Sequence, residues 1–202
     1  MSQRVLDILS TRFEGAILQT HGQFGDDTAI VDPAQWKAIA QFLRDDSRLA
    51  MDHFIDLTAV HYPDREEGRF EVVLHLRSFD KAHRIRLKAR LDLQDDGHVH
   101  IDTLADVWAG ANWFERECFD MFGVVFEGHP DLRRILMYEE FEGYPLRKDY
   151  AADRIQPLVP FREEAQGKLP PFDRHEGMPF GRQTHDHRPG GRNLLGFERE
   201  DA

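Results

Sequence analysis

Cysteine is almost absent from this sequence: Cys118 is the only one among 202 residues. One thiol cannot form an internal disulfide, and a cysteine-rich zinc site needs several thiolates. An iron–sulfur cluster held within one chain needs about four. We therefore expect a chain that has no disulfide and no cluster of its own.

Long apolar segments, excess positive charge and common catalytic motifs are also missing. No run approaches the roughly 18 apolar residues of a membrane-spanning helix, and the start, MSQRVLDILS, is too polar for a secretory signal. The net charge is -11, whereas nucleic-acid-binding domains usually carry a basic patch. No G-x-x-x-x-G-K-[ST], G-x-G-x-x-G or G-x-S-x-G occurs. We expect a chain on the cytosolic side of a membrane, or free in the cytosol, without a nucleic-acid partner.

What is present is the pattern of a folded domain. A helix is expected over residues 2–13, and a hairpin where GAILQT and DTAIV flank a glycine-rich turn. Asp32-Pro33 is typical of a helix start. Three alternating runs follow within residues 51–93, and the last alternates almost strictly between apolar and basic residues, as an antiparallel strand with one wet face does. The sequence predicts an α/β fold of the α+β type, with a mixed, largely antiparallel sheet and flanking helices.

The last quarter of the chain differs in composition. Six of the ten prolines fall at or after position 157, with frequent glycine and isolated phenylalanines. We therefore assign residues 1–150 to an α/β domain and residues 151–202 to an extended Pro/Gly-rich tail.

The stretch DDGHVHIDT contains a candidate metal site. We expect a turn with Gly97 in the left-handed region, closing a hairpin with the preceding run. His98, His100 and Asp102 then share one strand face, which resembles the H-x-H-x-D-H motif of metallo-β-lactamase-like hydrolases. Thr103 stands where the last histidine of that motif would be. A solvated strand face is the favoured interpretation, and a small metallohydrolase is the distant alternative.

The stretch NWFERECFDMFGVVFEGHPDLRRIL gathers the cysteine, a histidine and several acids, as a catalytic site would. At helical spacing, however, Cys118 lies within an apolar arc with Phe114 and Phe122. A nucleophilic thiol needs a partly exposed, electropositive setting. We therefore interpret Cys118 as a buried structural residue. Glu115 falls in the same arc and, as the third residue after Asn112, is expected to cap the helix start.

The opposite arc of this helix is polar. Arg116 and Asp120 have the spacing of an i, i+4 ion pair, and Glu117 lies between them. Trp113 points the same way, and an exposed Trp beside ordered charges is typical of a partner anchor. The arc predicts a binding surface rather than acid–base catalysis.

A basic segment follows the helix. His129-Pro130-Asp131 reads as a turn because proline restricts the residue before it to extended backbone. It is expected to present a basic rim made of Arg133, Arg134, Arg147 and Lys148. Two interpretations stay open: the rim grips carboxylates or carbonyls of a neighbouring chain, or it forms internal salt bridges that stiffen a loop.

From Glu115 onward the sequence resembles one family. EREC-FDMFGVVFEGHPDLRRIL and FEGYPLRKDY look like the signature of the C subunit of respiratory complex I, NADH–quinone oxidoreductase, which is often called the thirty-kilodalton subunit. The resemblance is specific over about residues 112–150 and extends in layout to residue 1. Ala151-Ala152-Asp153 departs from the family pattern, which usually has proline there.

The resemblance implies a scaffold and assembly subunit in the peripheral arm, on the cytoplasmic face of the bacterial inner membrane. Residues 1–150 would then dock onto other subunits, and residues 151–202 would wrap a neighbouring subunit. It implies no cofactor and no catalytic residue in this chain, since FMN, the iron–sulfur clusters and the quinone pocket belong to partner subunits. The alternative is the equivalent subunit of a related dehydrogenase or hydrogenase that does not use NADH. The expected partner interface comprises Trp113, Arg116, Glu117, Asp120, His129, Pro130, Asp131, Arg133, Arg134, Arg147, Lys148 and Asp149.

Overall fold

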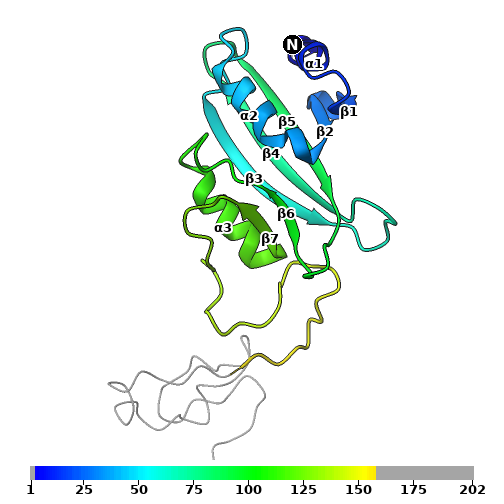
Figure 1. Ribbon diagram of the computed structural model, residues 1–202, viewed down its shortest axis with the longest axis vertical. Helices are drawn as coiled ribbons and strands as arrows, with labels where there is room; N and C mark the ends of the chain where they lie inside the picture. Colours follow the sequence, from blue (N-terminus) through cyan, green and yellow to red (C-terminus); the bar gives the residue numbers. More distant parts are fainter. Residues whose placement is uncertain (1–2, 158–202) are drawn as a thin grey trace, which may run out of the picture. The chain divides into compact units, whose positions relative to one another are not determined.

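The computed structural model describes residues 3–157, which form a five-stranded sheet, three α-helices and a separate two-stranded sheet (Figure 1). The large sheet has the order β1-β2-β5-β4-β3. Its neighbours are antiparallel except β2 and β5, which run parallel, and β6 pairs with β7 in parallel. The elements are α1 (Gln3–Arg12), β1 (Ile17–His21), η1 (Gln23–Gly25), β2 (Thr28–Val31), η2 (Pro33–Gln35), α2 (Trp36–Asp45), β3 (His53–His61), β4 (Phe70–Ser78), β5 (His83–Leu91), β6 (Val99–Asp102), α3 (Ala111–Phe122) and β7 (Val124–Glu127).

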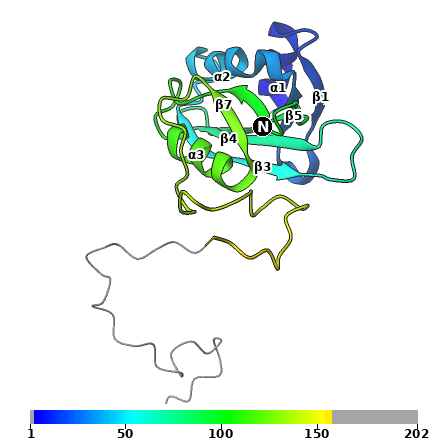
Figure 2. The same cartoon turned by 60° about the horizontal axis from the view of Figure 1, so that its bottom comes forward.

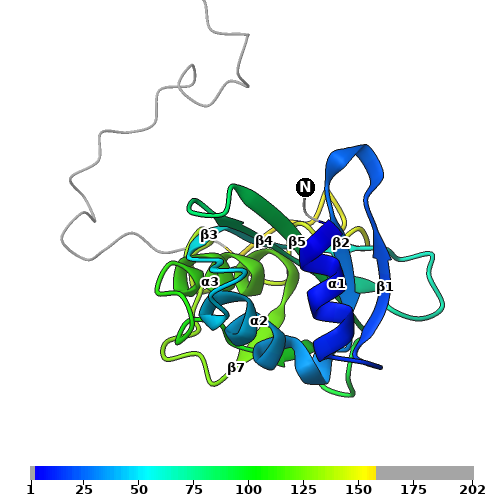
Figure 3. The ribbon, with the colours of Figure 1, turned by 90° about the horizontal axis from the view of Figure 1, so that it is seen from above.

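One face of the large sheet carries the hydrophobic core. Leu57, Leu74 and Leu87 lie side by side across β3, β4 and β5 and are buried. Residues of α1, α2 and α3 belong to the same apolar cluster, and Figures 2 and 3 show α1 and α2 together over the sheet. The predicted α+β fold with a mixed, largely antiparallel sheet is confirmed.

The local predictions for the first third are also confirmed. β1 and β2 form the expected antiparallel hairpin. Pro33 begins the 3-10 helix η2, where the Asp32 side chain accepts a hydrogen bond from the Ala34 N–H. This is a local N-cap, which the sequence pattern encodes directly.

The hairpin expected around Gly97 is wrong. Gly97 does take a positive φ of 78°, but β6 pairs with β7 and not with β5. Val99 and Ile101 are buried there beside Val124 and Phe126, because α3 leads the chain back so that β7 runs next to β6. A hairpin and a parallel pair bury the same alternating residues, so the alternation could not distinguish them.

The predicted tail lies almost wholly outside the described residues. Only residues 151–157 belong to the described part. Gln156 there donates to the Glu142 carbonyl and to the Tyr150 hydroxyl. The beginning of the tail is therefore hydrogen-bonded to the segment before it, and the wrapping of a neighbour stays a prediction.

Candidate docking site

Residues 128–150, which we call the docking loop, run along the side of α3 that the sheet does not cover. Hydrogen bonds join the loop to the helix. Arg116 of α3 donates to the Arg133 and Arg134 carbonyls, and the Met121 carbonyl of α3 accepts from the Leu146 N–H. The helix thus contacts β3 on one side and the docking loop on the other, while Trp113 and Glu117 stay exposed.

Cys118 lies on the sheet side of α3, as expected. Its Sγ is 3.6 Å from the Leu57 carbonyl oxygen of β3. Burial raises the pKa of the thiol well above its usual value, so a thiolate is not available for nucleophilic attack. The interpretation of Cys118 as a buried structural residue is confirmed.

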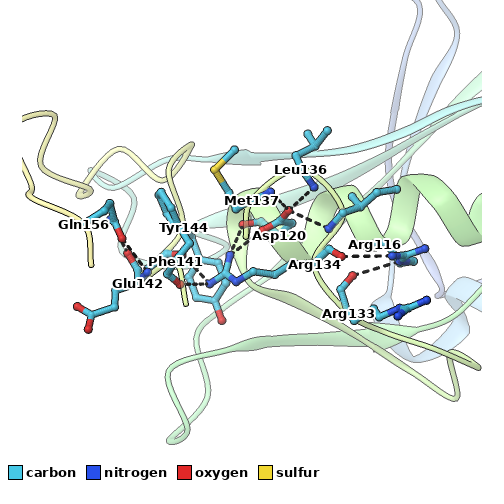
Figure 4. A network of polar contacts seen from close by, with 12 residues as sticks. Arg116, Asp120, Arg133, Arg134, Leu136, Met137, Phe141, Glu142, Tyr144 and Gln156 are labelled. Carbon is cyan, nitrogen blue, oxygen red and sulfur yellow. Dashed lines mark hydrogen bonds and ion pairs between the residues drawn. The ribbon is translucent and has the colours of Figure 1, made fainter. Parts of the chain in front are cut away.

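Asp120 is the centre of the docking site, and it is fully buried. Its Oδ2 accepts hydrogen bonds from three successive backbone N–H groups, at 3.0, 2.7 and 2.8 Å, and its Oδ1 lies 2.6 Å from Arg134 Nη1 (Figure 4). Burial alone would oppose ionisation, but the Met137 N–H, the Arg134 guanidinium and the remaining N–H groups outweigh it and lower the pKa of Asp120. The donors to Oδ2 are Ile135, Leu136 and Met137.

Arg134 completes this arrangement from inside the docking loop. Besides Asp120, it donates to the carbonyls of Phe141 and Gly143, each at 3.0 Å, and its guanidinium lies over the Phe141 and Tyr144 rings. One planar cation therefore holds the helix and two carbonyls of the loop together. Arg134, which the sequence predicts in an exposed basic rim, is therefore turned into the protein.

Arg116 and Arg147 also bind carbonyls within the chain. The expected i, i+4 pair between Arg116 and Asp120 is wrong, because Arg116 donates to loop carbonyls and Asp120 is taken by Arg134. Arg147 Nε lies 2.5 Å from the Phe122 carbonyl, and burial lowers the pKa of its guanidinium. These groups stiffen the loop, which is the second of the two interpretations left open by the sequence.

Gly123 allows Arg147 to approach the end of α3 so closely. Its φ is 73°, the left-handed conformation expected at the C-terminal end of a helix. A Cβ there would lie 2.6 Å from the Tyr144 ring and closer still to the Arg147 guanidinium. Glycine is therefore required at position 123 for two reasons: its backbone has a positive φ, and a side chain would collide with Tyr144 and Arg147.

Glu115 is turned into the protein, and the expected cap on Asn112 is wrong. The helix begins at Ala111, and Glu115 accepts from the Thr103 hydroxyl at 2.5 Å and from the Leu104 N–H at 2.6 Å. Burial raises the pKa of Glu115 to about 7, although both donors act against it. The Thr103 hydroxyl donates to Glu115 and also accepts from the Ala105 N–H at 3.1 Å.

Histidine side chains fix the loop at two further points. The buried His129 ring lies 3.2 Å from the Asn112 carbonyl through Nε2, and its Nδ1 accepts from the Asp131 N–H. His61 at the end of β3 accepts from the Lys148 N–H at 3.0 Å. Sequence reasoning missed His61 because nothing local connects residues so far apart in the chain.

The candidate metal residues serve other contacts. His100 lies between Asp96 and Glu127, at 2.8 and 2.6 Å, and Glu127 above all raises the pKa of the ring. His98 faces the Gly123 carbonyl and the Tyr144 hydroxyl, and Asp102 is exposed. Within residues 3–157 no three His, Cys, Asp or Glu side chains are grouped to hold a metal ion.

Several side chains of the site remain exposed and available to a partner. Trp113 is 60% exposed, with the Arg116 guanidinium 5.3 Å from its ring. Leu136 and Leu146 are 57% and 50% exposed. Of the residues expected at the partner interface, those exposed are Trp113, Glu117, Pro130, Asp131, Arg133, Lys148 and Asp149. Sequence reasoning missed the two leucines, although apolar residues in a charged loop are themselves a signal.

The buried carboxylates, the arginines and the His129 ring of the site are all hydrogen-bonded within the chain. Helices long and apolar enough to span a bilayer are not found in the described part of the chain.

Comparison with known proteins places the chain in a family. Residues 29–156 match the family described as "Respiratory-chain NADH dehydrogenase, 30 Kd subunit". The C subunit of NADH-quinone oxidoreductase from Xanthobacter autotrophicus is 44% identical over 142 residues, which are 70% of this chain and 66% of that protein. The C subunit from a Roseiflexus species is 42% identical over 171 residues, covering 79% and 96% of the two chains.

Two solved structures share the fold. A trypsin-resistant fragment of Nqo5 superposes with a TM-score of 0.52 at 26% identity, covering 64% of this chain and 98% of that one. A chain of an archaeal membrane-bound sulfane sulfur reductase superposes with a TM-score of 0.63 at 20% identity, covering 75% and 86%, and shows likeness of fold alone. Taken with the family match over residues 29–156, the chain belongs to the family of the 30-kDa subunit of respiratory-chain NADH dehydrogenase.

Proposed function

We propose that this chain is a non-catalytic docking subunit in the peripheral arm of NADH–quinone oxidoreductase. Its partners carry the flavin, the iron–sulfur clusters and the quinone site, and it holds them in register on the cytoplasmic face of the bacterial inner membrane. The observation that carries the proposal is the buried Asp120–Arg134 pair. This pair orders the docking loop, which contains much of the sequence motif that is most specific to the family.

The physical reason is preorganisation. Three N–H groups and one guanidinium converge on Asp120, and Arg134 in turn holds the Phe141 and Gly143 carbonyls. A loop ordered before binding loses less conformational entropy when a partner docks. Its exposed Leu136 and Leu146, with Trp113 beside it, then supply apolar contact area, which is where binding energy concentrates.

The reactive-looking residues support a structural rather than a catalytic role. Cys118 is buried beneath β3, and Asp120 is ionised but enclosed. Glu115 is enclosed by Thr103 and Leu104. None of them opens onto a site where a substrate could reach it, so we expect the purified chain to bind neither flavin nor cluster.

The rival parent enzyme is a related dehydrogenase or hydrogenase that does not use NADH. The fold does not distinguish between the two parent enzymes, since a chain of a sulfane sulfur reductase shares it. The identity of more than 40% with the C subunits of NADH-quinone oxidoreductases favours the NADH-dependent complex.

The test is affinity purification of the tagged chain from a gentle membrane extract. We expect the flavin- and cluster-bearing chains to accompany the wild-type protein. The Leu136→Ala/Leu146→Ala double variant should retain about tenfold less of them, because apolar anchors are removed from the interface. Leu18→Ala is the matched control, as Leu18 is 61% exposed on β1, far from the docking loop in the sequence.

Two results would overturn the proposal. One is recovery of the wild-type chain alone. The other is a fully assembled complex in Arg134→Ala or Asp120→Ala that has lost turnover selectively, which would place chemistry within this chain.

A further inference from the structure

The sheet has a second face, opposite the helices, that the docking site does not use. Side chains alternate along β4 and β5, so Val73 and Lys88 point away from the core that Leu74 and Leu87 enter. Val73 and Ile30 are buried and flank Lys88 in the neighbouring strands, yet neither belongs to the main core. We call this surface the open face, and its charged residues are Asp26, Asp56, Arg65, Glu71, Arg77, Arg84, Arg86, Lys88 and Arg90.

The open face is positive, although the chain is acidic. It holds six basic and three acidic residues, whereas the whole chain has a net charge of -11. The long aliphatic stems of arginine and lysine can cover apolar positions such as Val73 while their charged heads stay at the surface. This accounts for burial without a covering helix.

Two carboxylates hold the cations in place. Glu71 is buried and bound by Arg65 at 2.9 Å, Lys88 at 2.9 Å and Arg90 at 3.2 Å. Burial opposes its ionisation, but these cations lower the pKa of Glu71 to about 2. Asp26 is bound by Arg84 at 2.6 Å and Arg86 at 2.8 Å. The cations outnumber the carboxylates that order them.

Spare donors therefore remain at the surface. The side chains of Arg84 and Arg90 are 62% and 43% exposed, and a guanidinium has five N–H donors. Held by internal carboxylates, they are already fixed in position, so a second set of acceptors would bind at a reduced entropic cost.

We propose that the open face docks a segment rich in Asp and Glu from a neighbouring chain of the complex. Charge complementarity selects this occupant, since a positive face with ordered arginines attracts and orients carboxylates. The proposal rests on the proposed function, because it needs a neighbouring chain. It adds a second contact surface on a different part of the fold from the docking loop.

The first experiment measures salt sensitivity in the intact complex. The tagged full-length Arg84→Gln/Arg90→Gln variant is compared with Arg12→Gln/Arg48→Gln, which removes two arginines from the end of α1 and the turn after α2. The bound complexes are washed with increasing salt. We expect the open-face variant to retain about five- to tenfold fewer partner chains at moderate salt, because exposed ion pairs are screened, and the control to match wild type.

The second experiment locates the contact with a variant that keeps the charge. A carbodiimide condenses an amine with a carboxylate in contact with it, so Arg90→Lys in the purified complex should yield an amide bond to an Asp or Glu of another subunit. Arg48→Lys should yield none with another subunit. Mass spectrometry identifies both residues of the link.

Three outcomes would overturn the proposal. They are equal salt profiles for the two double variants, links from position 90 only to Glu71 of the same chain, and binding to phosphatidylglycerol vesicles that Arg84→Gln/Arg90→Gln abolishes, which would assign the face to lipid. In each case wild-type co-purification still stands, so the proposed function survives. If the wild-type chain brings no partner, both fail.

Discussion

Helix α3 carries two fully buried carboxyl groups with opposite surroundings. Glu115 meets two donors in the segment just after β6, and burial raises its pKa to about 7. Asp120 meets three N–H groups and a guanidinium of the docking loop, which lower its pKa. A buried carboxyl group stays ionised only where donors and cations compensate its charge. Asp120 is compensated in this way and organises the docking loop, whereas Glu115 is only enclosed.

The largest effect should come from Asp120→Ala. It leaves three backbone N–H groups and a guanidinium without their acceptor, so we expect a loss of about 3–5 kcal/mol in the free energy of unfolding. Hydrogen exchange should accelerate at the amides of Ile135, Leu136 and Met137. Unchanged protection at these three amides would mean that Asp120 does not hold the loop.

The next effect is a pH dependence that distinguishes the two acids. The folded pKa of Glu115 is about 7 and its usual value 4.5, so its contribution is fully present below about pH 4.5 and is lost as the pH rises through about 7. The loss is on the order of 3 kcal/mol. Asp120 behaves oppositely, because its lowered pKa gives a contribution that is present at neutral pH and lost in acid.

Glu115→Gln isolates the first of these contributions. The amide keeps the shape and an acceptor for the Leu104 N–H but cannot ionise. The difference between wild-type and variant free energies of unfolding, measured from pH 4.5 to 8, should therefore change with pH. A constant difference would show that Glu115 titrates normally and that the contrast with Asp120 is absent.

A smaller effect should follow Arg134→Lys. Lysine keeps the charge beside Asp120 but cannot reach the Phe141 and Gly143 carbonyls with a planar fork. We expect about 1–2 kcal/mol lower stability in denaturant titration. Arg133→Lys is the matched control, since Arg133 is exposed and its side chain pairs with the neighbouring Asp131 at 3.0 Å, and it should change stability by less than about 0.5 kcal/mol. Equal effects at both positions would contradict the inward role of Arg134.

Part of this fold could be predicted from local patterns in the sequence. The hairpin of β1 and β2, the Asp32 cap, the burial of Cys118, the exposure of Trp113 and the end of α3 at Gly123 all depend on neighbours within a few residues. The motif around residues 112–150 also identified the family. These features follow from backbone preference and helical or strand periodicity, which one segment contains in full.

The tertiary structure decided the rest. A helical wheel assigns the arc with Arg116 and Asp120 to solvent, but the docking loop binds Arg116 and buries Asp120. Likewise β6 pairs with β7 across α3, and Glu115 bonds to Thr103 rather than to its own helix start. The sequence shows which groups must be satisfied, whereas the partner that satisfies each one depends on which distant segment the folded core brings into contact.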